Sequence, residues 1–186
     1  GYWTREGRVA GSLRGDDSAL LMDRALDFMR RSAKSGKPFF AVIWFHAPHV
    51  PFVAMPAQRK LYSDHPESEQ HFWGSVTSLD EQMGRLRSTL DELGVRDDTM
   101  LWYASDNGPE GDAPTPASPG SSGPWRGRKR SLFEGGIRVP FIVRWPQKVN
   151  AATSTGQLVS TVDIAPTILS LAGIKPGANF SGKDFS

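Results

Sequence analysis

The 186-residue chain contains no cysteine, so it can form neither a disulfide nor a thiolate metal site, and it has no thiol nucleophile. It has no apolar run long enough to cross a membrane, and we expect no membrane partner. The formal net charge of +2 is too small to indicate a nucleic-acid partner. The chemistry of this chain must therefore come from histidine, acidic, amide and basic side chains.

The length and composition are those of one globular domain. A hydrophobic content of 38% with 23% charged residues suits a single well-packed core, and nothing in the sequence indicates a second domain. No signal-like segment opens the chain. Because it begins at Gly1 rather than at methionine, we expect that an upstream part could have been removed by processing or truncation.

Two apolar runs predict strands. Residues 39–45 read Phe-Phe-Ala-Val-Ile-Trp-Phe, without the alternation of a half-exposed strand, so we expect a strand covered on both faces. Residues 99–104 predict a second buried strand. A long amphipathic helix ending at Gly94 is predicted between them by the spacing of Phe72, Val76, Leu79, Met83, Leu86, Leu90 and Leu93. Strand, helix and strand in this order favour a right-handed parallel crossover.

Other elements frame this unit. A helix is predicted to begin at Asp16 and Asp17, whose short acidic side chains suit a first helical turn, and to end before Gly36. Its apolar face would carry Leu21, Ala25, Phe28 and Met29. A strand is expected over residues 139–145, and a last helix begins at Ser160 and Thr161 and ends at Gly173. The pattern indicates an α/β protein.

Polar side chains follow both strands of the predicted crossover. His46 and His49 come after the first, held by neighbouring prolines, and Asp106 and Asn107 come after the second. Ligands bind beyond the carboxyl ends of parallel strands, so the two groups should meet at one edge of the sheet. Carboxylate and amide oxygens suit Ca²⁺ or Mg²⁺. The alternative readings are a simple Asp-Asn-Gly turn and solvated loop histidines.

Two loop segments follow this edge. Residues 109–123 are rich in proline, glycine and serine, a composition that predicts a mobile loop. Residues 126–130 read Arg-Gly-Arg-Lys-Arg, which indicates either a nucleic-acid or targeting patch, or a clamp for a sulfate or phosphate group. Because no aromatic residues are interleaved with the cluster, base stacking is disfavoured.

Taken together, several blocks resemble the type I sulfatase family. The blocks are His-Ala-Pro-His-Val-Pro at 46–51, Leu-Asp at 79–80 with Gly-Arg-Leu at 84–86, Ser-Asp-Asn-Gly at 105–108, and Gly-Arg-Lys at 127–129 with Glu-Gly-Gly-Ile-Arg-Val-Pro at 134–140. Residues 160–173 are similar to the segment that follows in those enzymes. The blocks come in the family's order and cover most of the chain from Asp16 onward.

The resemblance implies an alkaline phosphatase-like (sulfatase) fold, α/β with a mostly parallel sheet and helices on both faces, here incomplete. Residues 1–186 would be the middle-to-late part of one catalytic domain. The implied activity is calcium-dependent hydrolysis of a sulfate monoester, with Mg²⁺ as an alternative ion. The substrate would be a sulfated small molecule or sulfated glycan, in a periplasmic, secreted or lysosome-like compartment.

Individual residues match the family's site. Asp106 and Asn107 match one pair of calcium ligands, and Lys129 matches the catalytic lysine that binds the sulfate group. His49 matches the histidine that contacts the sulfate and assists departure of the alcohol, with His46 as a neighbour that binds substrate. These residue types fit the task, because a cation, an ammonium and an imidazole stabilise charge on a leaving oxygen or protonate it.

The chain departs from the family in its nucleophile. Sulfatases use a formylglycine made from the Cys or Ser of a C/S-x-P-x-R motif, which we expect upstream of this chain with two further calcium-binding aspartates. Residues 122–126 fit that motif by letter but lie in a glycine-serine loop, so we do not expect Ser122 to be the nucleophile. Two alternatives stay open: a phosphoester or phosphonate hydrolase of the same superfamily, and an inactive remnant or anion-binding module.

Overall fold

The computed structural model describes residues 3–5, 7–8, 16–115, 117–177 and 179–185. They form two compact units, Gly1–Val149 and Asn150–Ser186. The elements of the first unit are β1 (Trp3–Thr4), β2 (Gly7–Arg8), α1 (Ser18–Lys34), α2 (Pro56–Lys60), α3 (Glu67–Glu92), β3 (Leu101–Ala104), α4 (Glu134–Ile137) and β4 (Phe141–Arg144). The second unit holds the 3₁₀ turn η1 (Thr161–Asp163) and α5 (Ile164–Leu171).

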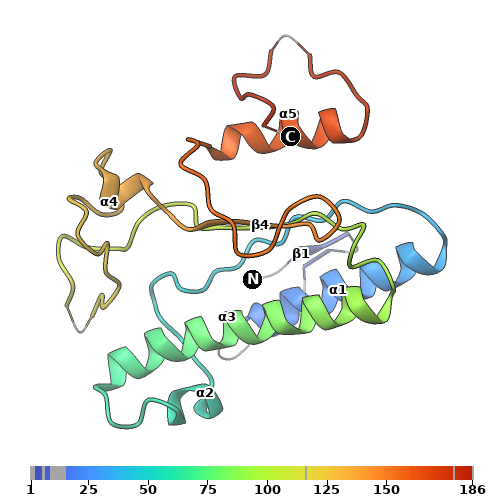
Figure 1. Ribbon diagram of the computed structural model, residues 1–186. Helices are drawn as coiled ribbons and strands as arrows, with labels where there is room; N and C mark the ends of the chain where they lie inside the picture. Colours follow the sequence, from blue (N-terminus) through green and yellow to red (C-terminus); the bar gives the residue numbers. More distant parts are fainter. Residues whose placement is uncertain (1–2, 6, 9–15, 116, 178, 186) are drawn as a thin grey trace. The chain divides into compact units, whose positions relative to one another are not determined.

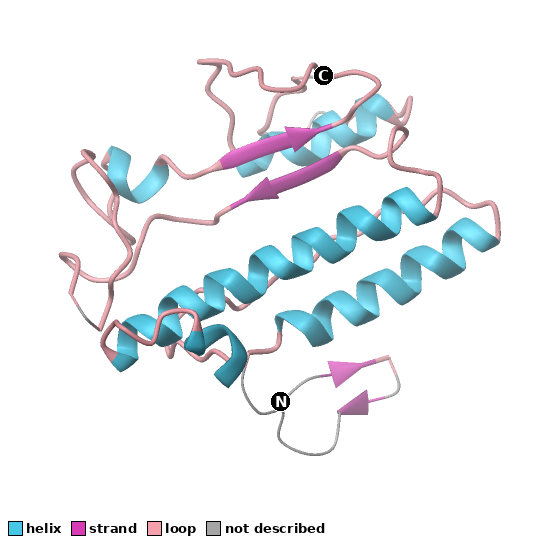
Figure 2. Cartoon of the chain, turned by 60° about the horizontal axis from the view of Figure 1, so that its bottom comes forward, coloured by secondary structure: helices cyan, strands magenta, loops and turns pink. Residues whose placement is uncertain are grey.

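Helices α1 and α3 lie side by side and form the core of the first unit (Figures 1 and 2). The buried core side chains on these two helices are Met22, Leu26, Met29, Leu86 and Leu90. Burying such aliphatic side chains stabilises the pair by about 1.5–3 kcal/mol for each. Both helices were predicted, but the apolar face of α1 was placed wrongly in part, because Phe28 is 40% exposed and Met22 is fully buried.

The ends of these helices follow their sequence signals. The carboxylate of Asp16 accepts a hydrogen bond from the amide of Ser18 at 3.1 Å, which satisfies an orphan donor at the start of α1. The hydroxyl of Ser78 on α3 donates to the same carboxylate, so the start of α1 is tied to α3. Gly36 and Gly94 adopt positive φ angles just past the two helices, as expected of helix stops.

Residues 39–45 run in extended form, and the structure assigns no strand to them. Phe39, Ala41, Ile43 and Phe45 pack against the core of α1 and α3. Their neighbours Phe40, Val42 and Trp44 are exposed, Trp44 by 84%. The prediction of a strand covered on both faces is therefore wrong for the described chain, because a continuous apolar run does not reveal which face is covered.

The prediction of a mostly parallel sheet with helices on both faces is also corrected. Strand β3 pairs antiparallel with β4, with Leu101 opposite Arg144 and Ala104 opposite Phe141. Strands β1 and β2 form a second antiparallel pair, and no parallel pair occurs among the described residues. The parallel crossover failed because the segment at 39–45 has no hydrogen-bonded neighbour strand in the described chain, whereas the chain returns after α4 in the opposite direction beside β3.

The second unit is built around Asp163. Its carboxylate accepts hydrogen bonds from the amides of Ser160, at 2.8 Å, and Lys183, at 2.7 Å. The bond from Ser160 caps the start of the last helical segment, which begins where the sequence predicted it. Gly173 follows the end of this segment with a positive φ angle. That all of residues 1–186 belong to one catalytic domain stays a prediction. No helix in the described part of the chain is long and apolar enough to span a membrane.

Candidate functional site

The chain leaves β3 in a tight turn that carries the two predicted metal ligands. The Asp106 side chain is exposed, and Asn107 is half-buried with its side-chain amide donating to the carbonyl of Gly108 at 2.8 Å. The amide of Gly108 donates to the carbonyl of Gly136 at 2.8 Å. The turn is thereby fixed against the segment around α4.

Glycine is required where these segments meet. A Cβ on Gly108 would lie 1.9 Å from the carbonyl oxygen of Gly135, and a Cβ on Gly136 would lie 2.1 Å from that of Ser131. Neither backbone oxygen can move aside as a flexible side chain would. The glycines of the Asp-Asn-Gly and Glu-Gly-Gly motifs therefore bring the turn after β3 into direct contact with α4 (Glu134–Ile137).

The buried guanidinium of Arg128 organises the loop that follows the turn. It donates to the carbonyl oxygens of Glu110, Gly111 and Gly120 at 2.6–3.1 Å, and the Arg128 side chain is buried. The hydroxyl of Ser118 donates to the carbonyl of Glu110 at 2.6 Å. The sequence predicted a mobile loop at residues 109–123, but composition could not show that an arginine further along the chain binds its carbonyl groups.

The Glu110 carboxylate pairs with the next two basic residues. Oxygen Oε1 lies 2.5 Å from the Arg130 guanidinium, and Oε2 lies 3.5 Å from Nζ of Lys129. The hydrogen bond from Arg130 is the chief cause that lowers the pKa of Glu110 to about 2. Arg130 reaches the carboxylate from a left-handed backbone conformation, φ 72°, which is uncommon for a residue with a side chain.

The structure brings His49 and Lys129 together. Nζ of Lys129 lies 2.8 Å from Nε2 of His49, and Nδ1 of His49 lies 2.7 Å from the carbonyl oxygen of Val50. The amide of Lys129 donates to the carbonyl of Pro109 at 2.9 Å, which holds the lysine beside the turn that carries Asp106 and Asn107. Two of the predicted site residues thus meet directly, and the backbone links them to the other pair.

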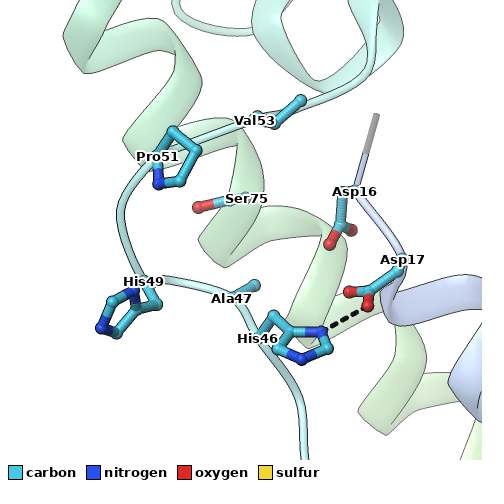
Figure 3. A pocket seen from close by; sticks show the side chains of 8 residues that line it. All are labelled: Asp16, Asp17, His46, Ala47, His49, Pro51, Val53 and Ser75. Carbon is cyan, nitrogen blue, oxygen red and sulfur yellow. Dashed lines mark hydrogen bonds and ion pairs between the residues drawn. The ribbon is translucent and has the colours of Figure 1, made fainter. Parts of the chain in front are cut away.

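His46 faces a different partner. Its Nδ1 lies 2.5 Å from Oδ2 of Asp17, a carboxylate that is 7% exposed (Figure 3). Figure 3 shows the His46 ring turned toward Asp17, whereas the His49 ring points away from the two acids. His46 and Asp17 line a pocket of about 170 Å³. The residues around this pocket are Asp16, Asp17, His46, Ala47, His49, Pro51, Val53 and Ser75. Substrate binding by His46 stays a prediction.

Sequence reasoning missed the role of Asp17. It was predicted to cap α1, but its carboxylate makes no capping hydrogen bond, and only Asp16 takes that role. The available signal was the presence of two adjacent acids at a helix start, where one carboxylate is enough to satisfy the first turn. The second acid contacts the imidazole of His46 instead.

Asp106 and Asn107 fit part of a calcium site. Both carry hard oxygen donors at a strand end, but Ca²⁺ takes six to eight oxygen ligands. Across the described residues, no group of three or more His, Asp or Glu side chains could hold a metal ion. The pair can therefore supply only part of a coordination shell, and their role as metal ligands stays a prediction.

The basic cluster at 126–130 does not form one continuous charged face in the described chain. Arg128 is buried against carbonyl groups, Arg130 is paired with Glu110, and the Arg126 guanidinium lies 4.1 Å from the centre of the Phe133 ring. This arrangement favours the anion clamp over a nucleic-acid patch. The hydroxyl of Ser122 donates to the carbonyl of Trp125 at 3.0 Å, within a local turn.

Comparison with solved structures defines the class of fold. A carbohydrate-bound crystal structure, "Ps i-CgsB in complex with k-i-k-neocarrahexaose", matches with a TM-score of 0.82 and 28% identity over 90% of this chain and 37% of that one. The PsFucS1 sulfatase from Pseudoalteromonas sp. matches with a TM-score of 0.79 and 27% identity, covering 96% of this chain and 36% of that one. The fold is that of the sulfatases, which are alkaline phosphatase-like proteins.

The family follows from the sequence. The model of the family described as Sulfatase matches residues 2–174, and the chain belongs to this family. Arylsulfatase G of Mus musculus is 32% identical over 176 residues, which cover 88% of this chain and 32% of that protein. N-acetylgalactosamine-6-sulfatase of Canis lupus familiaris is 34% identical over 162 residues, which cover 84% of this chain and 29% of that protein. The resemblance stated from the motifs is confirmed, and the chain spans about a third of these relatives.

Proposed function

We propose that this chain is the middle-to-late part of the catalytic domain of a sulfuric ester hydrolase that cleaves a sulfate monoester. The observation that carries the proposal is the 2.8 Å contact between Nζ of Lys129 and Nε2 of His49, which joins two motifs that lie 80 positions apart in the sequence. An ammonium and an imidazole at this separation can contact the same anionic group.

The two side chains have complementary tasks. The Lys129 ammonium binds a sulfate oxygen and stabilises negative charge that develops during cleavage of the S–O bond. His49 acts as the general acid when its ring is protonated, and gives the proton on Nε2 to the departing alkoxide, while Lys129 keeps its own proton and charge. The carbonyl of Val50 keeps the ring in place by accepting from Nδ1 at 2.7 Å.

A divalent cation and a formylglycine, both outside the described residues, complete the proposal. Asp106 and Asn107 would hold Ca²⁺, with Mg²⁺ as the alternative ion, together with ligands from the rest of the protein. The bound cation would neutralise charge on the sulfate oxygens. A formylglycine upstream of this chain would supply the nucleophile. Both assignments rest on family membership and on the hard oxygen donors of the pair.

The proposed substrates are sulfated glycans or sulfated small molecules. Support comes from names of relatives, since one acts as an N-acetylgalactosamine-6-sulfatase and another similar structure holds a neocarrahexaose. A periplasmic, secreted or lysosome-like compartment is part of the same proposal.

The test uses the protein that carries this chain together with its upstream segment. Lys129→Ala and His49→Ala should each lower kcat/KM for 4-nitrophenyl sulfate by about a hundredfold or more. Lys148→Ala is the matched control, because this lysine is exposed and lies outside the site, and its activity should be that of wild type. Mass spectrometry of the upstream segment should show a formylglycine.

Three results would overturn the proposal. Faster turnover of 4-nitrophenyl phosphate or a phosphonate ester than of the sulfate would favour the related hydrolases. Absence of a formylglycine motif together with no turnover would favour an inactive remnant. Activity that survives both substitutions but is lost in Ser122→Ala would assign the nucleophile to this chain itself.

A further inference from the structure

Three consecutive basic residues bind one glutamate. The backbone carbonyl of Glu110 accepts from Arg128, while its carboxylate pairs with Lys129 at 3.5 Å and with Arg130 at 2.5 Å. The turn at Lys129 thus directs its ammonium toward both His49 and Glu110. An anion that binds this ammonium comes within a few ångströms of a fixed negative charge.

The charge of this carboxylate does not change over the working pH range. Hydrogen bonding from Arg130 lowers the pKa of Glu110 to about 2, so the group is ionised at any pH used for catalysis. Lys129, Arg130 and Glu110 together contribute one net positive charge. The exposed Asp112 adds a weaker negative field at Arg130.

We propose that Glu110 is a specificity-determining residue that favours singly charged sulfate esters over doubly charged phosphate esters at the Lys129 site. The inference rests on the proposed function and adds to it the reason for the choice between two ester classes. A sulfate monoester carries one negative charge, whereas a phosphate monoester carries nearly two above its second pKa of about 6. The Glu110 carboxylate repels the second charge more than the single one.

The expected size of the effect follows from the distances. An anion oxygen bonded to the Lys129 ammonium at about 3 Å lies roughly 6 Å from the carboxylate. At that separation, in a site open to solvent, one unit of charge changes the binding of another unit charge by about tenfold. Glu110→Gln keeps the backbone carbonyl and the side-chain shape, so the substitution changes mainly the charge.

The experiment measures binding of a matched pair of non-hydrolysable anions to the protein that carries this chain. The probes are phenylphosphonate, doubly charged above its second ionisation, and benzenesulfonate, singly charged, both titrated by calorimetry at the same pH. The ratio measured is the Kd of benzenesulfonate divided by the Kd of phenylphosphonate. It should rise about tenfold in Glu110→Gln, because the doubly charged anion gains more affinity than the singly charged one. Arg130→Gln should shift it the other way, and the double substitution should restore the wild-type ratio.

Glu134→Gln is the control, because Glu134 pairs with Arg138 at 2.9 Å and does not contact Lys129. It should leave the ratio unchanged. A parallel loss of affinity for both anions in Glu110→Gln would show a structural role, and an unchanged ratio would also overturn the inference. If Glu110→Gln does not fold, Arg130→Gln decides alone, since a ratio that fails to fall there contradicts the charge argument.

The two proposals fail separately. A shift of the Kd ratio in a protein without sulfatase turnover would leave the charge selection intact and overturn the proposed function. Turnover of sulfate esters, together with a Kd ratio that is the same in wild type and Glu110→Gln, would support the proposed function and overturn the charge selection.

Discussion

Nε2 of His49 lies 2.8 Å from the Lys129 ammonium, and Nδ1 of His49 lies 2.7 Å from the Val50 carbonyl oxygen. A carbonyl oxygen can only accept, so Nδ1 must carry the proton of the neutral ring. Nε2 then holds the lone pair that accepts from the ammonium. This one relationship sets the tautomer of the histidine and the direction of the lysine together.

The tautomer can be tested by long-range ¹H–¹⁵N correlation on the protein with labelled histidine, at a pH where the rings are neutral. His49 should show a protonated Nδ1 and a bare Nε2. His71 is an internal control with the opposite expectation, because its Nδ1 accepts from the amide of Ala54 at 3.1 Å. A protonated Nε2 on neutral His49 would contradict the contact with Lys129.

Removing the charge of Glu110 should change the pH dependence of stability. Because pairing lowers the pKa of this group from 4.5 to about 2, its contribution is complete above pH 4.5 and is lost as the pH falls toward 2. Urea midpoints of wild type and Glu110→Gln should therefore differ most above pH 5 and converge near pH 2. A difference that stays constant over this range would show that the ion pairs do not stabilise the fold.

Arg128→Lys should destabilise the protein despite keeping the charge. A lysine cannot reproduce the planar fork that contacts three carbonyl groups, so buried acceptors would lose their partners at a cost of about 3 kcal/mol. The free energy of unfolding in urea measures the change. Arg126→Lys, at an exposed position, should cost about 0.5 kcal/mol or less.

Two glycine substitutions should change the free energy of unfolding in opposite directions. In Gly136→Ala the new methyl would lie 2.1 Å from the Ser131 carbonyl oxygen, and the free energy of unfolding should fall by about 2–3 kcal/mol. Gly84→Ala places a methyl in open space on the exposed face of α3 and should raise it by about 1 kcal/mol. Equal effects at the two positions would contradict the close contact at α4.

Helices α1, α3 and α5 were predictable because their signals are local, whereas the short helices α2 and α4 were not predicted. The three-and-four spacing up to Leu93, the stop at Gly94 and the acids before Ser18 each act within a few residues. The strand β4 was located for the same reason. Its direction beside β3 depends on how the chain returns after α4, which is a tertiary property that periodicity does not contain.

The candidate site was predictable only as motifs. The resemblance of these motifs to the sulfatase family implied that His49 and Lys129 contact the same sulfate group, and the structure places the two side chains in contact. The inward direction of Arg128, the pairing of Asp17 with His46 and the triple contact of Glu110 were not predicted. Charged residues look alike in a sequence, and which of them is buried is decided by carbonyl groups and carboxylates far along the chain.

Side chains at residues 39–45 are alternately packed on the core and exposed, and this has a practical consequence for handling the chain by itself. Phe40, Val42 and Trp44 present a row of large apolar side chains on an extended segment without a hydrogen-bonded neighbour in the described chain. Such a row favours pairing between identical molecules. Preparations of the isolated 186 residues should therefore scatter light increasingly with concentration, and a charged residue in place of Val42 should suppress that association.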